Sequence, residues 1–268
     1  MKDMVGFIGT GNMGGALARA AAKAVPADKL LLADNMREKA EALAQVLGCK
    51  ASDNETIAKI CSFIFLGVKP QMMEAMLSTL APVLAERTEP FVLVSMAAAL
   101  PMADIRRMAG GAYPIIRIMP NTPVAVGSGI VLYDATENVS AESLEQFRAC
   151  LRHAGLVDAI EEKLMDAASA ITGCGPAYAC MFMEAMADGG VACGLPRPKA
   201  QAYAAQMLMG TAKLILESGQ HPGALKDAVC SPGGSTIAGV RALEQGGFRA
   251  TAMDAVESAY IRTKEMAK

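Results

Sequence analysis

Several features are scarce in this sequence. The chain of 268 residues has no tryptophan, only 4% aromatic residues and only two histidines. Its 25 basic and 27 acidic side chains nearly cancel, so no positive stripe is available to neutralise the phosphates of a nucleic acid. The longest apolar runs, such as residues 93–101, fall far short of the roughly 20 residues needed to cross a bilayer. These absences argue against a nucleic-acid partner and a membrane span.

The cysteines and the amino-terminal residues bear on metal binding and on the cell compartment. The seven cysteines are scattered, with no Cys-x-x-Cys pair and no ligand spacing that includes a histidine. We therefore expect reduced thiols and no metal site. The first residues run directly into a strand-like segment that Gly9 interrupts, so no secretory signal is visible. The sequence predicts a folded protein of the cytoplasm.

The first part of the chain alternates strands with helices. Short apolar segments bounded by turn residues predict strands at 5–8, 30–33, 63–66, 91–94 and 115–118. Helix-like stretches follow most of them, which indicates an α/β protein with a parallel sheet covered on both faces. Ser52 and Glu55 have the spacing of a capping box, and Ser140 is a good N-cap for a helix through His153.

The strand pattern stops near residue 160, and the rest of the chain reads as all helical. The pattern predicts helices from Pro176, over 198–217, from Ser235 or Thr236 to 245, and over 249–268. We therefore expect a Rossmann-type domain over residues 1–162 and a helical domain over 163–268. Small residues and 19 methionines suit close helix packing, and the apolar excess favours an oligomer.

The amino-terminal turn carries the clearest chemical signal. Gly9-Thr10-Gly11-Asn12-Met13-Gly14 follows a predicted strand and opens a predicted helix, and Asp34 ends the next strand. In this context Gly9 forms a tight turn, Gly11 admits a pyrophosphate, and Gly14 lets the helix lie close to the sheet. The free N–H groups at the helix start favour an anion. This unit predicts dinucleotide binding.

The sequence does not decide between NAD and NADP, and two further loops allow more than one role. Asp34 favours the ribose hydroxyl of NAD, whereas Arg37, after Asn35, could receive the 2′-phosphate of NADP. Lys69, within Val68-Lys69-Pro70, could face phosphate or ribose oxygens, and Asn121, after another strand end, could offer both a donor and an acceptor to the nucleotide. Either loop could equally be ordinary turn chemistry.

A second informative turn lies in the helical part. Ser231-Pro232-Gly233-Gly234 runs into the helix start Ser235-Thr236, which presents backbone N–H groups and hydroxyls that suit a small carboxylate. The alternative is that Ser235 or Thr236 only caps the helix.

Together these motifs resemble the pyrroline-5-carboxylate reductase family over essentially the whole chain. The resemblance rests on segments 7–14, 68–70, 117–123, 173–178, 184–188, 221–227 and 231–236. It implies reduction of the C=N bond of 1-pyrroline-5-carboxylate to L-proline, the last step of proline biosynthesis, with NADPH or NADH. It also implies a homodimer through the helical domain, with dimers that often assemble further to decamers.

The resemblance also implies roles for particular residues. The turn 9–14, Asn54 and Val68 to Pro70 would hold the nucleotide. The turn 231–236 would bind the carboxylate, and Thr236 would hydrogen-bond the ring nitrogen as the catalytic residue. The stretch 34–37 varies within the family, which leaves the coenzyme preference open.

Several other residues have side chains that could be catalytic, but structural roles explain them. Hydride addition to a protonated imine requires no histidine dyad, so we expect surface or turn roles for His153 and His221. We also expect structural roles for Tyr178, Cys174, Glu184 and Asp188. Dehydrogenases of 3-hydroxyacids share the glycine turn but use a lysine that segment 173–190 lacks. A reductase of another cyclic imine and an inactive NAD(P) sensor remain as alternatives.

Overall fold

The computed structural model describes residues 4–266, which form two compact units. The first extends to Gly173 and includes the chain from Tyr260 onward, and the second comprises Cys174–Ala259. The first is α/β and the second is all helical, as the sequence predicts. The division after residue 162 stays a prediction; helix α7 (Glu162–Thr172), which follows that point, packs against the sheet.

An eight-stranded sheet organises the first unit, with the strand order β3-β2-β1-β4-β5-β6-β7-β8. The strands are β1 (Val5–Ile8), β2 (Leu30–Ala33), β3 (Lys50–Ala51), β4 (Phe63–Leu66), β5 (Val92–Ser95), β6 (Ile115–Pro120), β7 (Gly129–Ala135) and β8 (Gly155–Ala159). Strands β1 to β6 pair in parallel, whereas β7 runs antiparallel to β6 and parallel to β8. The parallel strands therefore all end at one edge of the sheet.

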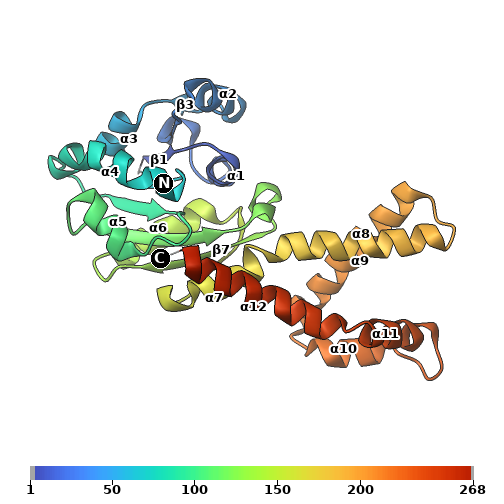
Figure 1. The fold of residues 1–268 in the computed structure, drawn as a ribbon. Coiled ribbons are helices and arrows are strands. Elements are labelled where there is room, and N and C mark those ends of the chain that lie inside the picture. Colours follow the sequence, from blue (N-terminus) through green and yellow to red (C-terminus); the bar gives the residue numbers. More distant parts are fainter. Residues whose placement is uncertain (1–3, 267–268) are drawn as a thin grey trace. The chain divides into compact units, whose positions relative to one another are not determined.

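Helices cover both faces of this sheet (Figure 1). One core contains residues of α1 (Asn12–Ala21), α2 (Arg37–Leu47) and α6 (Ala141–Leu151), and the other contains residues of α3 (Asn54–Ile60), α4 (Pro70–Ala85) and α5 (Met102–Ala109). The short helices η1 (Ala27–Lys29) and η2 (Thr122–Val126) complete the unit. Phe7 stacks on Phe65 in the first core, while the adjacent Ile8 and Leu66 lie in the second. Burial on both faces explains the continuous apolar strands.

Two helix starts test the predicted caps. The Ser140 hydroxyl accepts a hydrogen bond from the Ser143 N–H at 3.0 Å, which confirms that cap. The predicted capping box at Ser52 is wrong. Asp53 caps α3 instead, and its carboxylate accepts from the N–H and the hydroxyl of Thr56 at 2.7 and 2.9 Å. The Asp53 carboxylate accepts these two hydrogen bonds through its two separate oxygens.

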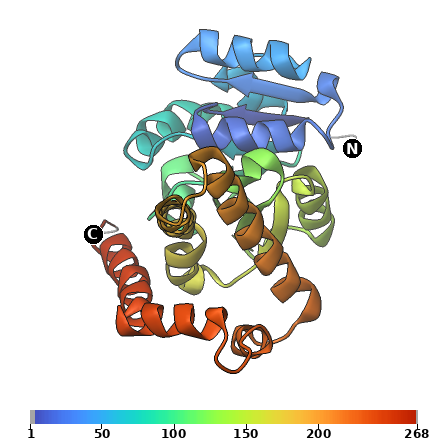
Figure 2. The ribbon, with the colours of Figure 1, turned by 90° about the vertical axis from the view of Figure 1, so that its right-hand side faces the viewer.

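The second unit is built from helices without a sheet. Its helices are α8 (Gly175–Ala192), α9 (Arg197–Ser218), α10 (Pro222–Ala228), α11 (Ser235–Gln245) and most of α12 (Phe248–Met266). Helices α8 and α9 lie side by side (Figure 1). Gly247, with φ +71°, lies in the sequence between α11 and α12. The chain turns a corner between these two helices (Figure 2). The predicted end of the last helix at Lys268 lies outside the described residues.

This helical unit buries little of its own apolar surface. Among its described residues only Ala187, Ala200 and Ala204 are buried. Met181 is 70% exposed and Leu216 is 82% exposed. Much of the apolar surface of these helices therefore lies uncovered in one chain. No helix among the described residues combines the length and apolarity that a membrane span requires.

Candidate active site

The glycine turn between β1 and α1 has the backbone geometry that its sequence predicts. Gly9 adopts φ +97°, a left-handed conformation that favours glycine, and its N–H donates to the Ala33 carbonyl at 2.8 Å. Gly11 is the N-cap of α1, and no side chain caps this helix start. The first N–H groups of α1 therefore have no acceptor within the helix. This arrangement favours an anion at the turn.

The space around each glycine of this turn shows whether the glycine allows close backbone packing or leaves room for a ligand. A Cβ on Gly14 would lie 2.1 Å from the Gly9 carbonyl oxygen, and one on Gly9 would lie 2.6 Å from that of Gly67. These two glycines thus allow close backbone packing. A Cβ on Gly11 would meet nothing within 4 Å, so open space adjoins the helix start there. A dinucleotide pyrophosphate fits this cradle.

Asp34, at the end of β2, is tied to the glycine turn. Its Oδ2 accepts hydrogen bonds from the N–H and hydroxyl of Thr10 at 2.8 and 3.1 Å, and its Oδ1 accepts from the Met36 N–H at 3.0 Å. Burial alone would raise the pKa of Asp34, but these hydrogen bonds and the charge of Lys39 hold it below its ordinary value. Asp34 is therefore a carboxylate at neutral pH.

The other nucleotide residues predicted in the first unit lie beyond the same sheet edge. Asn54 follows β3 as the first residue of α3, and Val68 and Lys69 follow β4. Lys69 is the N-cap of α4, and Pro70 fixes its first position. Ligands of open α/β sheets bind at the carboxyl ends of the strands. The structure therefore gathers these side chains at the edge that carries the glycine turn.

Asn121 also lies at this edge, after β6, but the protein itself occupies its amide. Its Oδ1 accepts from the Ile130 N–H at 2.9 Å, and its Nδ2 donates to the Thr172 carbonyl at 3.0 Å. These bonds join the end of α7 to the sheet. They give Asn121 a structural role and use one of its two amide N–H donors and one of its two acceptor positions, so its contact with the nucleotide stays a prediction.

Two features of this region escape sequence reasoning. The Thr172 hydroxyl is buried without a hydrogen-bond partner among the described residues. Arg117, on β6, is buried and pairs with Glu162 at 3.2 Å and Asp166 at 3.5 Å. Lys264 of α12 also pairs with Asp166 at 3.2 Å. No sequence pattern identifies partners this far apart in the chain.

The predicted substrate turn lies in the helical unit. Gly233 adopts φ +67°, and the Gly234 N–H donates to the Ser231 carbonyl at 3.0 Å. Gly234 is the N-cap of α11, and no side-chain hydrogen bond caps this helix. Ser235 and Thr236 thus do not serve as caps. Their exposed hydroxyls and the helix-start N–H groups are available to an external carboxylate.

Several residues that the sequence analysis expects to have structural roles make ordinary structural contacts. The Nδ1 of His221 accepts from the Gly223 N–H at 3.0 Å as a helix cap, and Asp188 forms an exposed ion pair with Arg197. The Tyr178 hydroxyl donates to the Ala255 carbonyl at 3.2 Å.

Burial raises the pKa of the Cys61 and Cys150 thiols to about 12, so both are unreactive at neutral pH.

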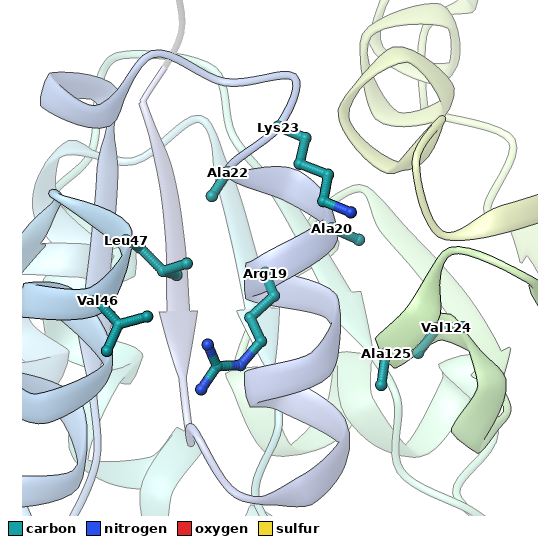
Figure 3. Close-up of a pocket in the computed structure, with 8 residues that line it drawn as sticks. All are labelled: Arg19, Ala20, Ala22, Lys23, Val46, Leu47, Val124 and Ala125. Atoms are coloured by element: carbon teal, nitrogen blue, oxygen red, sulfur yellow. The ribbon is translucent and has the colours of Figure 1, made fainter.

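A separate pocket lies beside the carboxyl-terminal half of α1 (Figure 3). Its volume is about 380 Å³, and its lining comes from α1 and the two residues after it, α2 and η2: Arg19, Ala20, Ala22, Lys23, Val46, Leu47, Val124 and Ala125. Arg19 and Lys23 extend in different directions in Figure 3. None of the predicted site residues lines this pocket.

The fold and the glycine turn together define a class, the Rossmann-type oxidoreductases that use NAD(P)H. Two family models match the chain. The first, for pyrroline-5-carboxylate reductase dimerisation, covers residues 162–266, and the second, for coenzyme F420-dependent NADP oxidoreductase, covers residues 4–99.

Full-length relatives identify the family. The pyrroline-5-carboxylate reductase of Escherichia coli is 37% identical over 100% of both chains. That of Pisum sativum is 37% identical over 98% of this chain and 95% of its own. A Plasmodium falciparum pyrroline carboxylate reductase solved with NADP bound has a TM-score of 0.88 at 33% identity, covering 100% of this chain and 99% of its own. The chain belongs to the pyrroline-5-carboxylate reductase family.

Proposed function

We propose that this protein reduces the C=N bond of 1-pyrroline-5-carboxylate to give L-proline, with NADPH or NADH as the reductant. The observation that carries the proposal is the pair of prepared anion sites in a member of this family. One is the open glycine turn before α1, and the other is the uncapped start of α11. A dinucleotide and a small carboxylate are the two anions that this reaction brings together.

The chain's own residues then bind and orient the reactants. The turn from Gly9 to Gly14 holds the pyrophosphate through backbone N–H groups, and Lys69 adds a positive charge at the same edge. When bound, the nicotinamide supplies the hydride. The N–H groups and hydroxyls of Ser231 to Thr236 hold the substrate carboxylate. Thr236 hydrogen-bonds the ring nitrogen, which gains the electron pair of the C=N bond and holds a proton that the imine either carries on arrival or takes through this hydroxyl.

We further propose that the active protein is a homo-oligomer of the cytoplasm. The uncovered apolar side chains of the helical unit and the match to the dimerisation family support pairing of two helical units. Assembly of these dimers to a decamer is the finer form of the proposal.

The decisive test is the loss of NADH or NADPH absorbance, measured in separate assays with pyrroline-5-carboxylate and with its six-membered analogue. We expect rapid oxidation with the five-membered imine. Oxidation with the six-membered imine alone would favour a reductase of another cyclic imine. Nucleotide binding without oxidation by either imine would favour an inactive sensor.

Thr236→Ala tests the catalytic assignment. We expect kcat to fall by about one to three orders of magnitude, the scale of one transition-state hydrogen bond, while nucleotide affinity is retained. The matched control is Thr211→Ala on α9, whose hydroxyl donates to the Met207 carbonyl at 2.9 Å. An unchanged kcat in Thr236→Ala would remove that residue from the mechanism.

A further inference from the structure

Five charged side chains alternate in sign where β2 passes into α2. Asp34 follows the strand, Arg37 begins the helix, and Glu38, Lys39 and Glu41 come after it. Arg37 Nε donates to Glu41 Oε1 at 2.7 Å, with the two side chains 85% and 50% exposed. In a dinucleotide fold, this junction receives the 2′ position of the adenosine ribose. The two cations, Arg37 and Lys39, and the three carboxylates, Asp34, Glu38 and Glu41, give the junction a net negative charge.

Two carboxylates of the junction, Asp34 and Glu41, differ in their freedom to move. Asp34 accepts three hydrogen bonds from Thr10 and Met36, which occupy three of about four acceptor positions on a carboxylate. Asp34 therefore cannot turn away without releasing the glycine turn, and its charge is fixed. Glu41 is held only by an exposed pair one helical turn from Arg37, and such pairs are weak. Arg37 and Glu41 are thus the adjustable part of the junction.

We propose that Glu41 sets the preference between NADPH and NADH by competing with the 2′-phosphate for the Arg37 guanidinium. The inference rests on the proposed function, because it concerns a reductase that is offered both coenzymes. The 2′-phosphate is the only group by which NADPH differs from NADH. Glu41 occupies the Nε–H of Arg37 and offsets its charge, so the 2′-phosphate of NADPH gains less from this guanidinium, whereas the binding of NADH does not involve the pair. The dissociation constants of the wild-type protein for NADPH and NADH therefore differ only modestly.

The test compares dissociation constants for NADPH and NADH, measured by isothermal titration calorimetry on the full-length protein. In Glu41→Gln we expect NADPH to bind on the order of 2- to 5-fold more tightly, the scale of one exposed charge pair, with little change for NADH. The probes 2′,5′-ADP and ADP should reproduce the difference, because they carry the adenosine half alone. High salt should reduce it.

The matched control is Glu145→Gln on α6, which removes the same charge from an exposed pair with Arg148 in the same compact unit. We expect no change in the NADPH to NADH ratio there. An unchanged ratio in Glu41→Gln, or an equal shift in both glutamate variants, would overturn the proposal.

A double variant separates competition from simple repulsion. In an Arg37→Gln background the competition is absent, so we expect the gain from Glu41→Gln to be largely lost. A gain that persists in full would overturn the proposal, since Glu41 would then act without Arg37. All these measurements are of binding, so they stand apart from turnover. A wild-type protein that oxidises neither coenzyme would refute the proposed function, while an unchanged ratio in an active enzyme would refute only this inference.

Discussion

At the residue scale, the buried Thr172 hydroxyl predicts a stabilising substitution. The hydroxyl has no hydrogen-bond partner among the described residues, and an unpartnered buried polar group lowers stability. Thr172→Val keeps the shape and removes the group, so we expect the free energy of unfolding to rise by about 1 kcal/mol. Urea denaturation measures it, and Thr172→Ser, which keeps the hydroxyl and removes a methyl, is the control. A less stable Thr172→Val protein would mean that the hydroxyl has a partner in solution.

Ala99 carries backbone strain that a glycine would relieve. It is the one described residue other than glycine with a positive φ, at +61°, and it lies in the loop after β5. The left-handed conformation costs an L-residue roughly 1–2 kcal/mol, and glycine's greater freedom in the unfolded chain offsets part of the gain. We expect Ala99→Gly to raise the free energy of unfolding by about 0.5 kcal/mol.

The neighbouring residue supplies the control for that effect. Ala98 has no positive φ, so Ala98→Gly should only add freedom to the unfolded chain and lower the free energy of unfolding by about 0.5–1 kcal/mol. The two variants should therefore shift Tm in opposite directions in the same thermal scan. A common direction would show that the Ala99 backbone is not strained in solution.

At the scale of an element, two glycines of the β1–α1 turn should respond differently to a side chain. Gly11 has φ −62° and open space beside it, so Gly11→Val should fold with a near-normal Tm and lose nucleotide binding. Gly14→Ala would place its Cβ 2.1 Å from the Gly9 carbonyl oxygen, so we expect a loss of about 1–3 kcal/mol in the free energy of unfolding. Thermal scans with and without NADPH measure both effects. Retained NADPH binding by Gly11→Val would contradict the position assigned to the pyrophosphate.

The elements also differ in how well the sequence predicts them. The five predicted strands form because they are short, apolar and buried on both faces, which a continuous apolar run reveals. Strand β3 has only two residues, and β8 is an edge strand whose Leu156 is 56% exposed, so neither has a clear pattern. Tertiary pairing to β2 and β7 forms them.

The candidate site likewise has local parts that the sequence predicts and long-range contacts that it does not. The glycine turn and the Ser231 to Thr236 turn are local, so their residue types alone predict their backbone geometry. The Asn121 amide and the Thr172 carbonyl meet across 51 positions of sequence, and only the folded chain brings them together. The residue types alone therefore predict Asn121 as a nucleotide ligand, but they give no sign of its structural partners.

At the scale of the whole molecule, the helical unit lacks the buried core that an independent unit needs. Helices α10, α11 and α12 bury no residue among those described, and Leu216 of α9 is 82% exposed. A second copy that covers this surface would make stability depend on concentration, because association favours the folded state by mass action. We expect light scattering to give a dimer or a multiple of dimers, and Tm to rise with protein concentration. Leu216→Glu should weaken both, whereas the control Val46→Glu, a 68% exposed residue of α2, should leave them unchanged. A monomer with a constant Tm would refute the oligomer.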